Sequence, residues 1–190
     1  EGGGDAETLE ALSIRGPQTL RHRGRALLAG DYETMAKESS PAVAVARAIP
    51  SCDSNGRKTP GWITLIIIPQ SKEPRPWPSF GLREHVRKFV EEHAPGDVAG
   101  LNHIFVTGPE YLAIDAEVTI IPHDPAEAGA VEQGSREALE EFFHPLYGGP
   151  QGNGWELGRD VFLSDVTSVL ERVNGVDYVE EIALFLNGVR

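Results

Sequence analysis

The residues "WITLIII" at 62–68 are the feature that most limits what this chain can fold into. The run is rich in β-branched side chains and lies between Gly61 and Pro69, a pattern typical of a strand. Because almost every position is apolar, we expect this strand to be buried on both faces of a sheet. Other strands and covering helices must come from the rest of the chain.

Three further segments have the pattern of strands. Residues 42–49 and 103–108 are short and apolar, and residues 176–186 close the chain as a third. Residues 111–122 add a fourth strand, which alternates cleanly and indicates a sheet with one solvated side. Its apolar face holds Leu112, Ile114, Ala116, Val118 and Ile120, and its polar face holds Asp115, Glu117 and Thr119.

Two longer segments have apolar residues at helical spacing. Residues 81–93 follow Ser79, which is suited to cap a helix N-terminus, and residues 125–143 place Pro125 in a first turn. The predicted fold class is therefore α+β, with a mixed or mostly antiparallel sheet flanked by amphipathic helices. The two stripes contain Leu82, Val86, Phe89 and Val90, and Val131, Ala138, Leu139, Phe142 and Phe143.

Weaker signals indicate three more helical segments. Asp31 is expected to be the N-cap of a helix over 31–39, and Ser164 that of a helix over 165–173. A helical lead-in is expected over 17–29.

The organisation is predicted as three stretches. Residues 1–16 are a flexible lead-in or linker, residues 17–70 a helical lead-in with the first strands, and residues 71–190 an α+β C-terminal region, in one or two small subdomains. A connector over 69–80 contains four prolines and should lack regular structure.

The charge balance limits the partners. The 190 residues carry 29 acidic and 17 basic side chains, a net charge of −12, which repels polyanions such as nucleic acid. No segment reaches the run of about 20 apolar residues that a membrane helix needs. We therefore expect neither a nucleic-acid partner nor a membrane partner.

The C-terminal third contains an unusual cluster of glycines in "HPLYGGPQGNGWELGRD", residues 144–160. A phosphate-binding loop needs its glycines between a strand and a helix N-terminus, but these follow a helix and lack the spacing of the known phosphate motifs. We interpret the cluster as a structural clasp of successive tight turns that can bury Trp155, with Arg159 placed to bond loop carbonyls or a partner's carboxylate. The clasp residues are His144, Pro145, Gly148, Gly149, Gly152, Gly154, Trp155, Gly158 and Arg159.

Residues 142–184 resemble the C-terminal signature of the baseplate J-like family, the baseplate assembly proteins of contractile-tailed phages and phage-derived injection machines. Residues 23–50 are similar to an upstream segment of that family, so the resemblance covers most of residues 15–187. The matched signature is His144, Pro145, Leu146, Gly148, Gly149, Gly152, Gly154, Trp155, Gly158, Arg159, Gly175, Val176 and Val179.

The resemblance implies a wedge subunit in the ring around the central hub and tube of a baseplate. Its expected partners are other wedge and hub subunits, with neighbouring copies paired through their C-terminal regions. Its expected location is the baseplate of a virion or phage-like particle, assembled in the bacterial cytoplasm. The family offers no catalytic site to transfer, so we expect neither an enzyme nor a cofactor or metal.

Three aromatic residues are interface candidates: Trp77, Tyr147 and Trp62. Each could equally pack within its own domain, and for the proline-flanked Trp77 we favour that interpretation.

Two other function classes remain open from the sequence alone. A cell-wall-active hydrolase would need a pair such as Asp115 with Glu117, or His144 with Asp160 and Ser164. A glycan- or receptor-binding module would need an aromatic platform, which three scattered tryptophans do not make.

Overall fold

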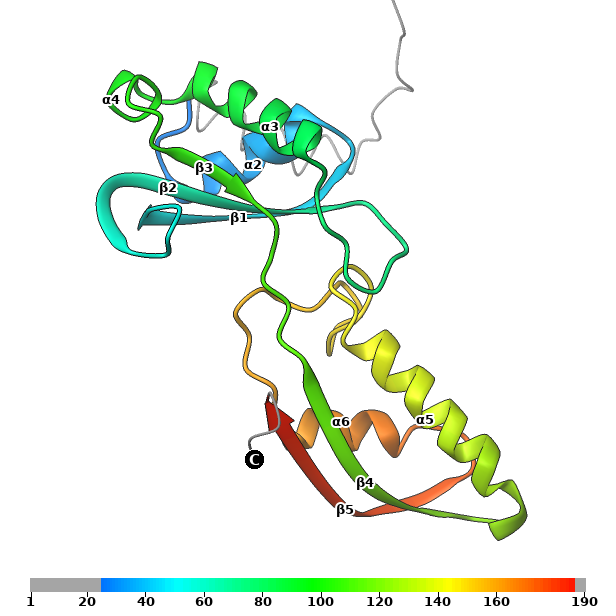
Figure 1. The fold of residues 1–190 in the computed structure, drawn as a ribbon. Helices are drawn as coiled ribbons and strands as arrows, with labels where there is room; N and C mark the ends of the chain where they lie inside the picture. The colour runs from blue at the N-terminus through cyan, green and yellow to red at the C-terminus, as the bar shows by residue number, and fades with distance from the viewer. Residues whose placement is uncertain (1–24, 187–190) are drawn as a thin grey trace, which may run out of the picture. The chain divides into compact units, whose positions relative to one another are not determined.

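The computed structural model describes residues 25–186, which form two compact units of an α+β fold (Figure 1). Unit 1 holds residues 25–71 and 76–109, and unit 2 holds residues 72–75 and 110–186. The expected lead-in over 1–16, and the expected helix over 17–29 up to residue 24, lie outside the described residues. The sequence-based division falls at residue 70, whereas the main boundary between the units falls after Pro109.

Unit 1 is built on a three-stranded sheet, here called sheet A. Its strands are β1 (Val43–Cys52), β2 (Lys58–Pro69) and β3 (Ile104–Thr107), in that spatial order. β2 runs antiparallel to β1 and parallel to β3. The apolar run over residues 62–68 therefore lies on the central strand, both edges of which are paired.

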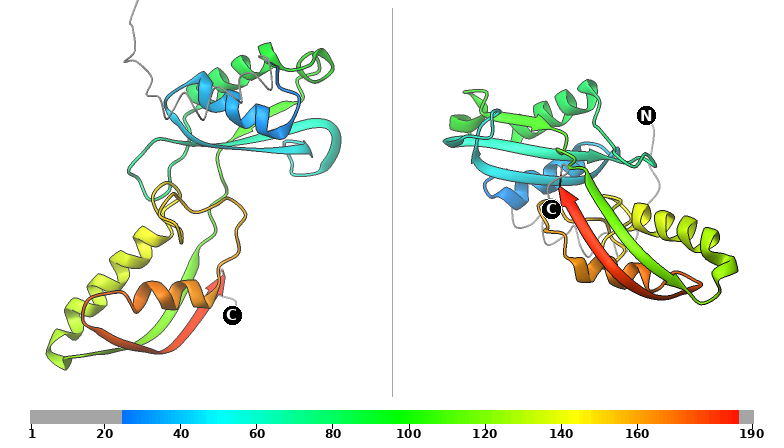
Figure 2. Two further views of the ribbon diagram at one scale, coloured as in Figure 1. Left: turned by 180° about the vertical axis from the view of Figure 1, so that it is seen from behind. Right: turned by 60° about the horizontal axis from the view of Figure 1, so that its bottom comes forward.

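The core of unit 1 lies between sheet A and two helices, α2 (Ala29–Ser39) and α3 (Phe80–His93) (Figures 1 and 2). Leu65, Ile67 and Ile68 on β2 have no exposed surface. Ile67 and Ile68 point to opposite faces of the sheet, so β2 is buried on both faces, as expected. The predicted helix stripes face this core. It includes Tyr32, Met35 and Ala36 of α2, and Val86 and Val90 of α3, with Leu82 and Phe89 half-buried against them.

The starts of α2 and α3 are fixed by side-chain capping. The Oγ atom of Ser79 accepts a hydrogen bond from the Leu82 N–H at 3.2 Å, as predicted. Asp31 also caps, but from the third position of α2 rather than as the N-cap. Its carboxylate accepts the N–H groups of Leu27 and Leu28, so the chain over 25–28 is not helical and the helix begins at Ala29.

Unit 2 pairs β4 (Ile114–Pro122) with β5 (Val176–Leu186) in a two-stranded antiparallel sheet, here called sheet B. Between the strands run a short 3-10 turn η1 (Pro125–Glu127), α5 (Ala128–Phe142) and α6 (Leu163–Leu170). One sheet was expected from the sequence, but the structure has two. In the described part of the chain, β4 and β5 pair only with each other.

Two expected helix boundaries in unit 2 are wrong. Ser164 lies inside α6, whose N-cap is Phe162, and α6 ends at Leu170 rather than at residue 173. Packing rather than capping determines where this helix forms, since Val166 and Leu170 are fully buried while no side chain caps its first turn. A four-residue helix in unit 1, α4 (Gly96–Ala99), carries no sequence signal that we recognised.

None of the helices over residues 25–186 has the length and apolar character needed to cross a membrane.

The β1–β2 hairpin loop is organised by Asp53. Its Oδ1 atom accepts the N–H groups of Asn55 and Arg57, both at 2.9 Å, and Oδ2 accepts the Thr59 hydroxyl at 3.2 Å. The Arg57 N–H is the main reason that the pKa of Asp53 lies below its ordinary value, with smaller contributions in the same direction from Asn55 and Thr59.

We expect Asp53→Ala to destabilise the folded state at neutral pH because these donors lose their acceptor. A carboxyl with a lowered folded pKa contributes stability above its unfolded pKa of about 4, and loses it as the pH falls through the folded pKa. The gap in unfolding free energy between wild type and variant should therefore narrow toward pH ~3. Urea titrations across this range measure it.

Ser54→Ala, at the exposed neighbouring position, is the control and should change little at any pH. A gap that stays constant with pH would show that the ionised form of Asp53 is not what organises the hairpin.

Candidate functional site: the glycine-rich clasp

The clasp, residues 144–159, folds back on the end of α5 through its own backbone. The Gly149 N–H donates to the Phe142 carbonyl at 2.7 Å, and the N–H groups of Gly148 and Trp155 both donate to the His144 carbonyl, at 2.9 and 3.2 Å. The Gly154 N–H donates to the Gly148 carbonyl at 2.9 Å. These glycine N–H groups are used within the loop, whereas a phosphate cradle would direct them outward.

Close backbone approach explains why three of the clasp positions are glycine. A Cβ atom on Gly148 would collide with the carbonyl oxygens of Glu141 and Phe142. A Cβ on Gly149 would lie 2.6 Å from the Gly154 carbonyl oxygen, and one on Gly154 would lie 2.5 Å from that of Pro145. At each of these three positions the backbone passes another backbone segment at a distance that only glycine permits.

Two other glycines are explained by their backbone conformation. Gly152 and Gly158 have φ angles of +70° and +80°, but a Cβ atom at either would meet nothing within 4 Å. They are needed for the turn conformation rather than for space.

Trp155 anchors the clasp in an aromatic cluster. Its ring centroid lies 5.4 Å from that of Phe142 and 5.2 Å from that of Phe143, at the end of α5. Phe142 is buried and Trp155 is half-buried. Such edge-to-face and tilted pairs add about 0.5–1.5 kcal/mol each beyond the apolar area they remove from water.

Arg159 connects the clasp to α6. Its guanidinium carbon lies 5.4 Å from the Trp155 ring centroid, and its Nη2 atom bonds the Asp165 Oδ2 atom at 2.9 Å. Asp165 occupies the first turn of α6, where the helix dipole favours a carboxylate. Arg159 was expected to bond loop carbonyls or a partner's carboxylate, whereas the carboxylate that it bonds belongs to this chain.

His144 is engaged by backbone groups on both ring nitrogens. The Leu146 N–H donates to Nδ1 at 3.1 Å, so the proton lies on Nε2, which donates to the Glu73 carbonyl at 3.2 Å. The ring stacks on Tyr147 with centroids 4.8 Å apart. In this state neither nitrogen is available to activate Ser164, and both Ser164 and Asp160 are exposed.

The other carboxylate pair, Asp115 and Glu117, is exposed on the face of sheet B that carries the polar residues of β4. Directly across the sheet from them lie Phe185 and Ala183. Among residues 25–186, no group of three or more His, Cys, Asp or Glu side chains is placed to hold a metal ion.

The three aromatic interface candidates differ in how much surface they offer. Trp77 is 54% exposed and Tyr147 is 47% exposed, although each packs one side, Trp77 close to Gly108 and Tyr147 on His144. Trp62 is half-buried and stacks on His103 with centroids 4.8 Å apart. Their role as interface residues stays a prediction.

Gly154→Ala and Gly158→Ala form a matched pair that separates crowding from backbone conformation. Both positions have positive φ, which costs an alanine about 1–2 kcal/mol. Because only position 154 also collides with a carbonyl, we expect Gly154→Ala to lower the unfolding free energy by about 1–3 kcal/mol more. Urea unfolding followed by tryptophan fluorescence measures the difference, and equal losses would contradict the crowding argument.

Trp155→Ala is expected to lower the unfolding free energy by about 3 kcal/mol, because the aromatic cluster loses its largest member. Trp77→Ala, at a more exposed tryptophan, should cost clearly less. Thermal melts of the two variants make the comparison. An unchanged melting temperature for Trp155→Ala would show that the clasp does not depend on this ring.

Comparison with known proteins adds one line of evidence. No protein-family model matches this chain, and no curated protein does. Among solved structures, the chain superimposes on a chain of the anti-feeding prophage (AFP) baseplate, determined by cryo-EM with six-fold symmetry, with a TM-score of 0.73 at 19% identity. The match covers 98% of this chain and 39% of the AFP chain. This chain therefore has the fold of about two-fifths of a chain found in that baseplate.

Proposed function

We propose that this chain is a structural component of the baseplate of a phage-like, contractile injection particle and acts through interfaces with neighbouring subunits. The observation that carries the proposal is the fold shared with the AFP baseplate chain over 98% of the residues. The chain spans 39% of that relative's length, so the proposal concerns the corresponding part of such a subunit.

A second, independent line supports the proposal. The clasp sequence resembles the signature of the baseplate J-like family, and it does so at residues that hold the loop together. Gly148, Gly154, Trp155 and Arg159 each make a contact that fixes the backbone. A loop fixed in this way suits a protein whose work is to hold a shape for its neighbours.

In the finer form of the proposal, the chain belongs to a wedge subunit of the ring that surrounds the hub and tube. It contacts other wedge and hub subunits, pairs with a second copy through its C-terminal region, and performs no catalysis. The particle is assembled in the bacterial cytoplasm. These details rest on the family resemblance.

Tagging the protein in the bacterium that encodes it tests the proposal. We expect the tagged protein to purify with other subunits of a contractile particle, and the isolated chain to scatter light as a monomer or weak dimer at micromolar concentration. Most of its interfaces would then lack their partners. A large homomeric ring formed by the chain alone would contradict the wedge role, and peptidoglycan cleavage that is lost in Glu117→Gln would favour the hydrolase instead.

A further inference from the structure

The two units carry very different charge. The described residues of unit 1 have 8 acidic and 8 basic side chains, whereas those of unit 2 have 17 acidic and 5 basic ones. Unit 2 therefore has a net charge of −12, equal to that of the whole chain. Such an excess destabilises a compact unit through self-repulsion, so a binding role is a reason for its presence.

Sheet B has one covered face and one open face. Val176, Val179 and Ile182 of β5 lie on the face shared with Val118 and Ile120 of β4, and α6 packs against β5 there (Figures 1 and 2). The strand register defines the opposite face, here called the open face. It pairs Asp115 with Phe185, Glu117 with Ala183, Thr119 with Glu181, and Ile121 with Tyr178.

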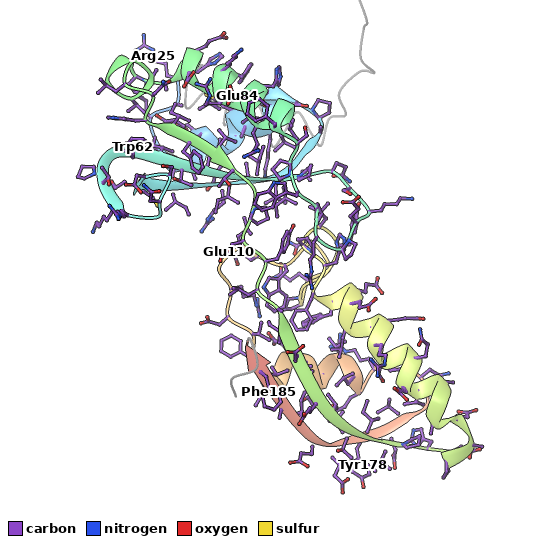
Figure 3. The ribbon with its side chains drawn as sticks, in the orientation of Figure 1. Arg25, Trp62, Glu84, Glu110, Tyr178 and Phe185 are labelled. Carbon is purple, nitrogen blue, oxygen red and sulfur yellow. The ribbon has the colours of Figure 1, made fainter. Side chains whose placement is uncertain are left out.

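The open face combines exposed carboxylates with aromatic anchors. Asp115, Glu117 and Glu181 are all exposed, and none forms an ion pair with another residue of the described chain. Tyr178 is 47% exposed and Phe185 is half-buried, and they mark the two ends of β5 (Figure 3). Aromatic residues are enriched at protein interfaces, and charged residues are typical of the rims around them.

The acidic surface of α5 differs because two of its carboxylates have partners within the helix and because it carries no exposed aromatic residue. Glu132 bonds Arg136 at 2.9 Å, and Glu137 accepts a hydrogen bond from the Gln133 amide at 2.7 Å. These side chains satisfy one another one helical turn apart, as on many solvated helices. The exposed part of α5 carries no aromatic residue. The open face is therefore the better docking surface.

We propose that the open face of sheet B docks a lysine- or arginine-rich surface of a neighbouring protein subunit. The inference rests on the proposed function only in taking that neighbour from the same particle. Tyr178 and Phe185 supply apolar contact, and the three carboxylates gain cationic partners that they lack within the chain. A second copy is a poor occupant of the open face, because face-to-face pairing would bring like charges together; the pairing of copies proposed above would therefore use another surface of the C-terminal region. Nucleic acids and anionic lipids are repelled for the same reason.

Zero-length cross-linking tests the inference in purified particles. A carbodiimide joins a carboxylate to a lysine amine only where the two are in contact, and mass spectrometry then identifies both. We expect Asp115, Glu117 or Glu181 to be joined to lysines of a different subunit. Links to a second copy of this chain would overturn the inference alone. An open face without links in particles that contain the chain would exclude a lysine-rich partner, and the paired variants below then test an arginine-rich one. Absence of the chain from the particles would overturn the proposed function as well.

A matched pair of variants gives a second readout. Asp115→Asn, Glu117→Gln and Glu181→Gln together neutralise the open face, and Glu132→Gln, Glu137→Gln and Glu140→Gln together remove the same charge from α5. All six residues are exposed, so both triple variants should fold. We expect incorporation into particles to fall at least about tenfold for the open-face variant, with much less change for the α5 variant. Equal losses would show that overall charge, rather than this face, is recognised.

Discussion

Contact between backbone atoms at the end of α5 decides how unit 2 is built. The Phe142 carbonyl, which the helix leaves without an internal partner, accepts the Gly149 N–H, and the chain can approach it because Gly148 has no side chain. From this contact the loop turns back, places Trp155 on Phe142, and brings Arg159 to Asp165 at the start of α6. α6 in turn packs on β5, so the effects of one close approach extend through the unit.

The division of charge between the units suggests a division of labour. Unit 1 balances its charges locally, as where Arg87 lies between Glu84 and Glu91 on α3. It therefore has little electrostatic reason to prefer any particular partner. Unit 2 holds its excess on rigid elements, where carboxylates without partners guide encounter and select against like-charged surfaces. For a subunit that must meet several neighbours in a fixed arrangement, charge confined to one unit adds orientation to binding.

Much of the fold could be predicted because its signals are local. The apolar run on β2, the alternation along β4 and the stripe on α3 each identify an element without reference to the rest of the chain. The errors arise where tertiary contacts decide at which residue a helix begins or which strands pair. Asp31 was expected to be the N-cap of α2, but it lies inside the helix and its carboxylate accepts N–H groups of residues that precede the helix. Ser164 is not the N-cap of α6, because this helix begins where its buried face requires. The separation of the strands into two sheets depends on pairings that no single segment encodes.

The clasp could be recognised from a local sequence signal, whereas the open face depends on tertiary contacts. Glycine spacing after a helix is visible in the sequence, and the N–H groups of these glycines bond within the loop and with the end of α5. The open face depends on register: Asp115 lies opposite Phe185, and Thr119 opposite Glu181, across segments far apart in the chain. The sequence showed Asp115 and Glu117 as a possible catalytic pair because it revealed only their own strand. Once the aromatic residues of β5 are placed beside them, the same carboxylates form one side of a mixed surface that suits a protein partner better than a substrate.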